Sequence, residues 1–115
     1  MPAETPRKIP VVFYRTRSEV VRDWLRGLDE PDRSAIGRDL MRVQYRWPVG
    51  MPLFRSLREG LWEVRSNLPS NRIARVLFSV EQECIVVLHG FVKKTLKTPN
   101  EDLALARKRK TEFES

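Results

Sequence analysis

Several residue types that build common catalytic and structural centres are scarce in this sequence. The chain has 115 residues with one histidine and one cysteine, His89 and Cys84. This pair offers too few nitrogen and sulfur ligands for a zinc site of the usual kind. A lone cysteine cannot form an internal disulfide, and the apolar neighbours of Cys84 predict a buried thiol. We therefore expect neither a metal centre nor another cofactor.

Long apolar runs and glycine-rich motifs are also absent. No apolar stretch approaches the roughly 18 residues of a membrane-spanning helix. The first residues, Met1 to Glu4, lack the charged start and apolar core of a signal peptide. We expect a cytoplasmic protein with no membrane partner. Because neither a glycine-rich phosphate loop nor a nucleophile elbow occurs, nucleotide-binding and serine-hydrolase functions are disfavoured.

Positive charge is what the sequence has in excess. Twenty-two lysines and arginines stand against 15 aspartates and glutamates, which gives a formal net charge of +7. The excess lies in the predicted sheet and its flanking loops rather than in the last helix, which is neutral overall. Such a surface favours nucleic acid or an acidic protein as partner. The length predicts one domain with a single core, over residues 1–115.

Apolar patterns and turn signals divide the chain into a β-αα-ββββ-α order. Alternating or apolar runs predict strands at residues 9–14, 53–57, 61–65, 72–80 and 84–91. Periodicity and capping residues predict helices at residues 19–28, 31–45 and from Pro99 onward. The order indicates an α+β domain with helices on one sheet face and a partly open second face.

Alternation along the last three strands sorts their side chains onto two faces of the sheet. One face is expected to form a core from Trp62, Val64, Val76, Phe78, Val80, Val86 and Leu88. The other is expected to carry Glu63, Arg65, Ile73, Arg75, Leu77, Ile85, Val87 and His89. Two arginines and the only histidine would then lie among apolar residues on one face.

The turn positions predict which of these side chains lie opposite one another. A turn centred near Ser70 pairs Arg65 with Arg75, and a turn centred on Gln82 pairs Arg75 with His89. Directly opposed like charges cost about 0.2–1 kcal/mol, so two facing arginines indicate a functional requirement. A phosphate between the guanidiniums would remove that cost. The alternative is that the two arginines point apart into water.

Three segments resemble one known family: residues 60–65 (GLWEVR), 75–78 (RVLF) and 88–95 (LHGFVKKT). On these motifs the chain resembles the RelE/HigB superfamily of bacterial and phage toxins, and most of all its HigB-like branch. In that branch a His-Gly-Phe-x-Lys-Lys-Thr run precedes a proline-initiated helix. The resemblance implies a single-domain RelE/ParE-like fold. Its mostly antiparallel sheet would have two N-terminal helices on one face, and a C-terminal helix would follow it.

The resemblance also implies a function. Members are ribosome-dependent, metal-independent endoribonucleases that cut mRNA and inhibit translation, and a cognate helix-turn-helix (HigA-like) antitoxin silences them. Their catalytic groove lies on the sheet face away from the N-terminal helices. By resemblance, the catalytic residues are Arg65, Arg75 and, at the end of the last strand, Lys93 or Lys94. His89 joins them as a candidate acid or base, because histidine can give and take a proton near physiological pH. The residues expected to bind substrate around them are Glu63, Arg58, Arg72 and Lys97, with Arg55 at the rim.

Some assignments stay open at this point. Several toxins of the superfamily place a tyrosine near the C-terminus in the groove, whereas the only tyrosines here are Tyr14 and Tyr45. The general base is therefore not identified: Glu63 either serves as base or neutralises Arg65, and His89 either transfers a proton or has a structural role. Two other functions remain: a toxin of the same fold that binds a protein such as gyrase, and a non-enzymatic nucleic-acid-binding module.

Overall fold

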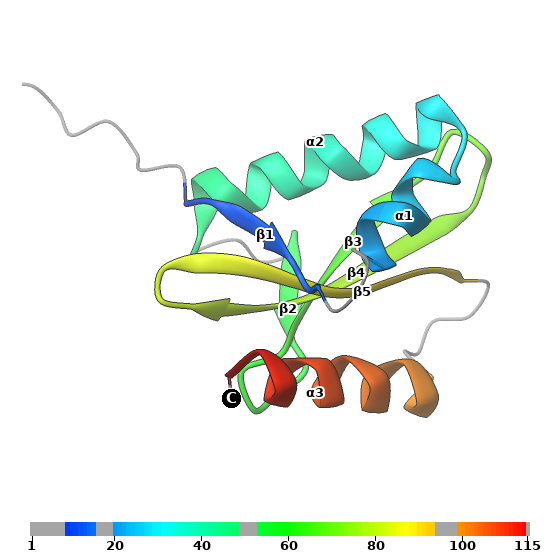
Figure 1. Cartoon of the computed structure of the whole chain (residues 1–115). Helices are drawn as coiled ribbons and strands as arrows, with labels where there is room; N and C mark the ends of the chain where they lie inside the picture. Colours follow the sequence, from blue (N-terminus) through cyan, green and yellow to red (C-terminus); the bar gives the residue numbers. More distant parts are fainter. Residues whose placement is uncertain (1–8, 16–19, 49–52, 94–98, 115) are drawn as a thin grey trace, which may run out of the picture.

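The structure, a computed structural model that describes residues 9–15, 20–48, 53–93 and 99–114, has the predicted order of strands and helices (Figure 1). The side chain of Lys93 is not among the described parts. The strands are β1 (Val11–Phe13), β2 (Phe54–Ser56), β3 (Trp62–Asn67), β4 (Ile73–Glu81) and β5 (Cys84–Lys93). The helices are α1 (Val20–Arg26), α2 (Glu30–Arg46) and α3 (Asn100–Glu114). The predicted α+β class is confirmed.

The five strands form one sheet in the order β1-β5-β4-β3-β2. β1 lies parallel to β5, whereas the other neighbours are antiparallel. β1 and β2 are therefore the edge strands, and each has three residues. The predicted meander of the last strands is confirmed, and β4 and β5 form the centre of the sheet.

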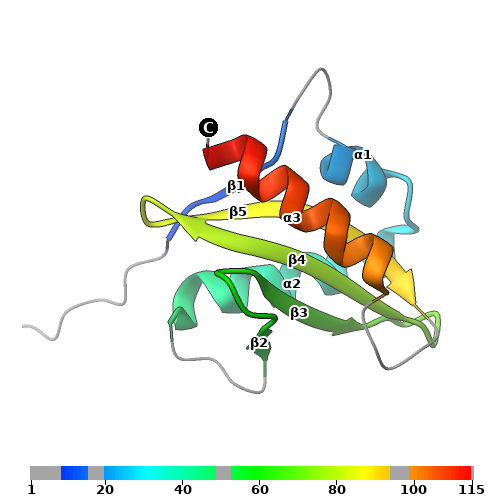
Figure 2. The same ribbon diagram turned by 90° about the horizontal axis from the view of Figure 1, so that it is seen from below.

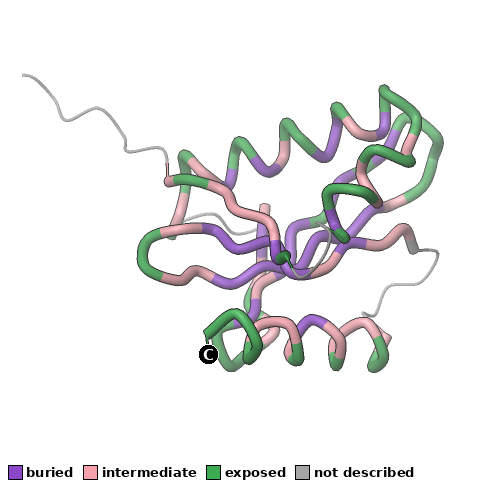
Figure 3. The backbone as a smooth tube through the Cα atoms, in the orientation of Figure 1, coloured by how far each residue is buried: buried purple, intermediate pink, exposed green. Residues whose placement is uncertain are grey.

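Helices α1 and α2 cover one face of the sheet, and the main core lies beneath them (Figure 1). The apolar stripe predicted for the second helix is confirmed, because Ile36, Leu40 and Val43 are buried against the sheet. At one end of this core Trp47 packs against the rings of Phe54, Trp62 and Phe78. Figure 3 shows the buried residues along the central strands and the exposed ones on the outward surfaces of the helices.

The second face of the sheet is more covered than the sequence predicted. Helix α3 crosses it over β4 and β5 (Figure 2), and a second core of Leu61, Leu77, Val86, Leu88 and Ala106 lies under the helix. The expectation that all helices share one face is therefore wrong, and only the β2–β3 side of this face stays clear of α3. Ala106 is the one fully buried residue of α3 among those described.

The register between β3 and β4 confirms the predicted pairing of Arg65 with Arg75. The turn has the expected centre: the Leu68 amide donates to the Arg72 carbonyl, and Asn71 takes a positive φ of 63°. Asparagine tolerates this left-handed conformation better than most residues. The sequence signal and the backbone therefore agree at this hairpin.

The register between β4 and β5 differs from the prediction in two steps. The turn consists of Gln82 and Glu83, both with positive φ, so Glu81 pairs with Cys84. A register shift then follows between Leu77 and Phe78, and it leaves Leu88 as an extra residue of β5. Such a bulge places two residues of one strand opposite one of the other.

The position of the turn, half a residue away from the expected centre, changes which β5 side chains face α3. Ile85 and Val87 belong to the core under α1 and α2, whereas Val86 and Leu88 pack under α3, the reverse of the expected faces. Arg75 pairs with Phe91 and not with His89, so that predicted pair is wrong; His89 pairs with Leu77. Because the bulge restores the alternation, His89 still lies on the face of the arginines.

Candidate active site

The residues predicted to be functional lie in three cross-strand rows on the α3 face of the sheet. Paired residues of neighbouring strands point to the same side, so each row can be followed from strand to strand. The rows are Arg55–Glu63–Leu77–His89, Arg65–Arg75–Phe91 and Asn67–Ile73–Lys93. The arginines therefore gather on the β2–β3 side of the face, which α3 does not cover.

Glu63 is the centre of a group that we call the arginine cluster, which consists of Arg55, Glu63, Arg65 and Arg75. Its carboxylate contacts three guanidiniums: Oε1 lies 3.1 Å from Arg55 Nε and 3.6 Å from Arg65 Nε, and Oε2 lies 3.5 Å from Arg75 Nη1. The Glu63 and Arg75 side chains are 0% and 1% exposed, whereas those of Arg55 and Arg65 are 44% and 42% exposed. The cluster therefore presents two cations to solvent and holds one cation below them.

The carboxylate of Glu63 offsets the repulsion between the positive charges of Arg65 and Arg75. The repulsion between Arg65 and Arg75 was expected to require a phosphate, and Glu63 contacts both guanidiniums instead. Burial lowers the pKa of Arg75 from its ordinary value, Glu63 opposes that change, and the positive charges of Arg65 and Arg55 lower the pKa further. With three guanidiniums and one carboxylate, the cluster keeps a net positive charge that can attract a phosphate.

His89 lies on the same face but is held by α3. Its Nε2 is 2.6 Å from Asp102 Oδ1, its Nδ1 is 3.3 Å from Arg109 Nη1, and its ring stacks on Phe91. Arginine can only donate, so Nδ1 accepts from Arg109 and Nε2–H donates to Asp102. The contacts thus assign one tautomer to the ring. His89 pairs with Leu77 rather than Arg75, so it stands one row away from the arginine pair.

Of the remaining predicted residues, the structure describes Arg58, Arg72 and the backbone of Lys93. Arg58 is exposed in the turn between β2 and β3, where its φ is 77°. Lys93 pairs with Ile73 at the end of β5. Lys94 and Lys97 lie outside the described residues, and so does Thr98, the expected cap of the last helix.

Arg72 has a structural partner. Its Nη2 lies 3.1 Å from Oδ2 of Asp32, a buried residue of α2 that also accepts hydrogen bonds from the amide and hydroxyl of Ser70. Burial alone would raise the pKa of Asp32, but the hydrogen bonds from Ser70 and Arg72 outweigh it and lower the pKa. Arg72 thereby ties the β3–β4 turn to α2, with its side chain 45% exposed.

The sequence predicted Arg55 only as a rim residue, whereas the structure places it against Glu63. The sequence also did not predict a second polar group, which lies near the end of α3. There Tyr14 donates to Glu112, and the Arg109 guanidinium lies 5.5 Å from the centre of the Tyr14 ring. The hydrogen bond to Glu112 is the main cause that raises the pKa of Tyr14. Arg109 also donates to the Leu88 carbonyl, which belongs to the extra residue of β5. No sequence signal links Tyr14 to the final helix.

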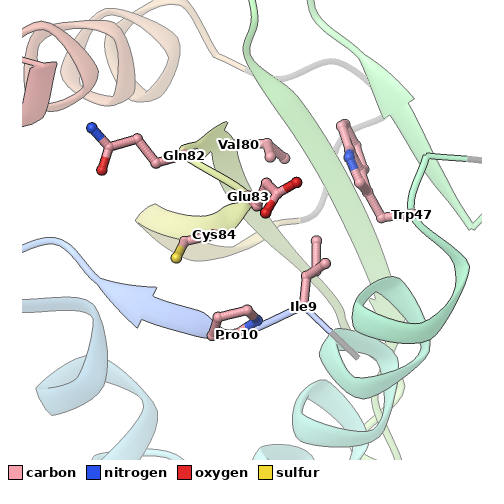
Figure 4. Close-up of a pocket in the computed structure, with 7 residues that line it drawn as sticks. All are labelled: Ile9, Pro10, Trp47, Val80, Gln82, Glu83 and Cys84. Atoms are coloured by element: carbon pink, nitrogen blue, oxygen red, sulfur yellow. The ribbon is translucent and has the colours of Figure 1, made fainter. Parts of the chain in front are cut away.

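A cavity of about 470 Å³ opens near the β4–β5 turn, away from the arginine cluster (Figure 4). Its lining residues are Ile9, Pro10, Trp47, Val80, Gln82, Glu83 and Cys84. None of the described residues that line it is a lysine or an arginine, so this lining does not suit a phosphate. Cys84 is partly exposed there, which corrects the prediction of a buried thiol.

Nowhere among the described residues do three His, Cys, Asp or Glu side chains gather as a metal ion would need. None of the helices in this part of the chain is both long and apolar enough to cross a membrane.

Comparison with known families gives one match. The family described as "Phage derived protein Gp49-like (DUF891)" matches residues 23–111 of the 115. The matched part runs from α1 to α3 and includes every residue of the arginine cluster. No curated protein matches the sequence.

Proposed function

Because the chain belongs to the Gp49-like family of phage-derived proteins, a family of toxin-like proteins of toxin–antitoxin systems, we propose that it is a toxin that cleaves mRNA on the ribosome. We place it in the HigB-like branch, on the motif of residues 88–95. Its partner would be a helix-turn-helix antitoxin, and it would act in the cytoplasm, where ribosomes translate.

The observation that carries this proposal is the arginine cluster around Glu63. RNA cleavage through the 2′-hydroxyl builds up negative charge on phosphorus, and permanently charged guanidiniums can stabilise that charge without a metal ion. Arg55 and Arg65 are each more than two-fifths exposed, so both can donate to the non-bridging oxygens of a phosphodiester. Arg75, buried against the other oxygen of the same carboxylate, would fix the orientation of Glu63.

The reaction also needs two proton transfers. The 2′-oxygen forms a bond to phosphorus and gives up its proton, and the bond from phosphorus to the 5′-oxygen breaks as that oxygen gains a proton. The products would be a 2′,3′-cyclic phosphate and a 5′-hydroxyl. His89, Lys93 and Lys94 are the proposed groups for these transfers, and Glu63 is the other candidate base. Use of His89 in this role requires it to exchange its contact with Asp102 for one with RNA.

The exposed arginines provide the cleanest test. We expect induction of the wild-type protein to stop growth and to produce new mRNA ends inside translated regions. Because Arg55 and Arg65 are half exposed, the double variant Arg55→Ala/Arg65→Ala should fold, and cutting should fall about 10²–10³-fold. Arg26→Ala, which removes an exposed cation from α1, is the control and should cut like the wild type.

Two results would contradict the proposal. The first is undiminished cutting in the double variant, because the cluster would then not contribute to the reaction. The second is growth arrest without new mRNA ends, which would favour a toxin that binds a protein target.

A further inference from the structure

A second group of arginines lies beside the proposed active site, between α2 and β3. A cavity of about 380 Å³ opens there, and its polar lining comes from Arg38, Asp39 and Arg42 of α2 and from Arg65 and Asn67 of β3. The cavity lies beside the end of the described β2–β3 ladder: the first residue of β2, Phe54, pairs with Val64, and Arg65 to Asn67 of β3 come after that pair.

The charge of the cavity is positive. Of the five polar residues that line it in the described part of the chain, three are arginines and one is an acid, Asp39, which lies 3.4 Å from Arg42. That ion pair is weak, because the Arg42 side chain is 63% exposed and exposed pairs contribute about 0–1 kcal/mol. Arg38 and Arg42 are one helical turn apart, so they point to the same side of α2. The cavity can therefore offer two neighbouring guanidiniums to an anion.

Arg65 joins this cavity to the arginine cluster. Its side chain contacts Glu63 in the cluster, and Arg65 is also one of the residues that line the cavity, so the two positively charged places adjoin at this residue. A chain with regularly spaced phosphates could occupy both at once, whereas a single small anion could occupy only one. The Asn67 amide can accept from and donate to the sugar or a base edge of such a chain.

We propose that the cavity between α2 and β3 binds a backbone phosphate of the RNA strand, next to the phosphate held at Arg55 and Arg65. The inference rests on the proposed function for the identity of the strand. Arg38 and Arg42 are the binding residues and take no part in bond cleavage. They set the direction in which the strand leaves the cleavage site, over the β3 edge and along α2.

The test measures binding separately from cleavage. A short single-stranded RNA with 2′-O-methyl groups at every position has no free 2′-hydroxyl, so it can bind but cannot be cut. Its affinity is measured by fluorescence anisotropy over a range of salt concentrations. For Arg38→Ala/Arg42→Ala we expect weaker binding and a shallower dependence of log K on log salt, by about 0.7 for each lost phosphate contact.

The matched control removes the same charge elsewhere. Arg22→Ala/Arg26→Ala loses two exposed arginines of α1 that are one helical turn apart and do not line the cavity. We expect this control to keep most of the wild-type affinity and its slope. Equal losses in both double variants would overturn the inference, because only net charge would then matter. Unchanged binding in Arg38→Ala/Arg42→Ala, or no binding by the wild type, would overturn it as well.

The outcomes also separate this inference from the proposed function. If the wild type binds the 2′-O-methyl RNA through the cavity but translated mRNA is never cut, the strand-binding site stands and the nuclease proposal fails. If mRNA is cut normally by Arg38→Ala/Arg42→Ala and binding is unchanged, the nuclease proposal stands and the inference fails. If labelled poly-glutamate binds the wild type but not Arg38→Ala/Arg42→Ala, and the RNA binds neither, an acidic protein is the ligand and the inference is overturned.

Discussion

At the scale of single residues, Glu63 stands out because its one carboxylate contacts three guanidiniums. We expect Glu63→Gln to lower the free energy of unfolding by about 3–5 kcal/mol, since it leaves the buried Arg75 without its counter-charge and beside two other cations. Urea unfolding at neutral pH measures this loss. The pair replacement Glu63→Met/Arg75→Met should recover much of it, because apolar side chains of similar size need no counter-charge.

Asp39→Asn is the control for the Glu63 prediction. It removes a carboxylate whose partner, Arg42, is largely exposed, so the unfolding free energy should change by no more than about 1 kcal/mol. A similarly small change for Glu63→Gln would contradict the prediction that the buried Arg75 depends on Glu63 for its counter-charge. It would mean that water, rather than Glu63, solvates the charge of Arg75.

The position of Glu63 beside the arginines could be predicted in part from the sequence. Alternation placed Glu63 on the face of Arg65 and Arg75, which the structure confirms. A two-residue turn at Glu59-Gly60 would place Arg55 opposite Val64. The turn instead spans Arg58 to Gly60, all with positive φ, and this brings Arg55 opposite Glu63. Counting across a two-residue turn therefore misses the third guanidinium, and nothing in the sequence states how deeply Arg75 is buried.

At the scale of whole elements, strand β5 shows where sequence reasoning fails and why. Side chains alternate with a period of two, so a shift of one residue exchanges the faces of every side chain beyond it. The β3–β4 turn contains Ser70 and Asn71, whose turn chemistry fixes its centre. The β4–β5 turn has Gln82 and Glu83 at positive φ without a glycine or asparagine to announce it. The bulge at Leu88 has no local signal either.

Helix α3 shows the same limit in another form. Its start after Pro99 is predictable from capping residues, but the face it covers depends on polar contacts far apart in sequence. Asp102 contacts His89, and Arg107 donates to the Leu57 carbonyl. Phe113, the aromatic residue of this helix, is 42% exposed. A weak apolar stripe could not indicate the docking site of this helix.

Gly90 of β5 lies directly against Trp24 of α1, so a side chain at this position would disturb the packing of the two elements. A Cβ at Gly90 would lie 2.3 Å from Trp24 Cζ3, closer than atoms can approach, so the indole would have to move. We expect Gly90→Ala to destabilise the protein by about 1–3 kcal/mol, the usual cost of overpacking a core. Thermal unfolding followed by circular dichroism measures the change.

Gly37 is the matched control for Gly90. It lies inside α2, where an added Cβ meets no atom within 4 Å. Alanine favours a helix over glycine by about 1 kcal/mol, so Gly37→Ala should stabilise the protein. If both alanine variants gained stability, α1 would not be packed on Gly90 in solution.

At the scale of the whole molecule, the two faces of the sheet differ in how firmly they are covered. Helix α2 buries Asp32, Ala35, Ile36, Leu40 and Val43, whereas α3 buries only Ala106 among its described residues. Much of the attachment of α3 is polar, through Asp102, Arg107 and Arg109. Because apolar burial dominates stability, α3 should open more readily than the rest of the fold.

Native-state hydrogen exchange tests this difference directly. We expect the amides of α3 to exchange at least about tenfold faster than those of α2 and β4, through an opening that leaves the sheet intact. Asp102→Asn should speed exchange in α3 further and leave β4 unchanged, because it weakens only the contact with His89. Opening of α3 would release the His89 ring toward the arginine side of the face, as the proposed proton transfer requires. Equal protection of α3 and β4 would mean that the helix leaves the sheet only on global unfolding, and His89 would then be excluded from the reaction.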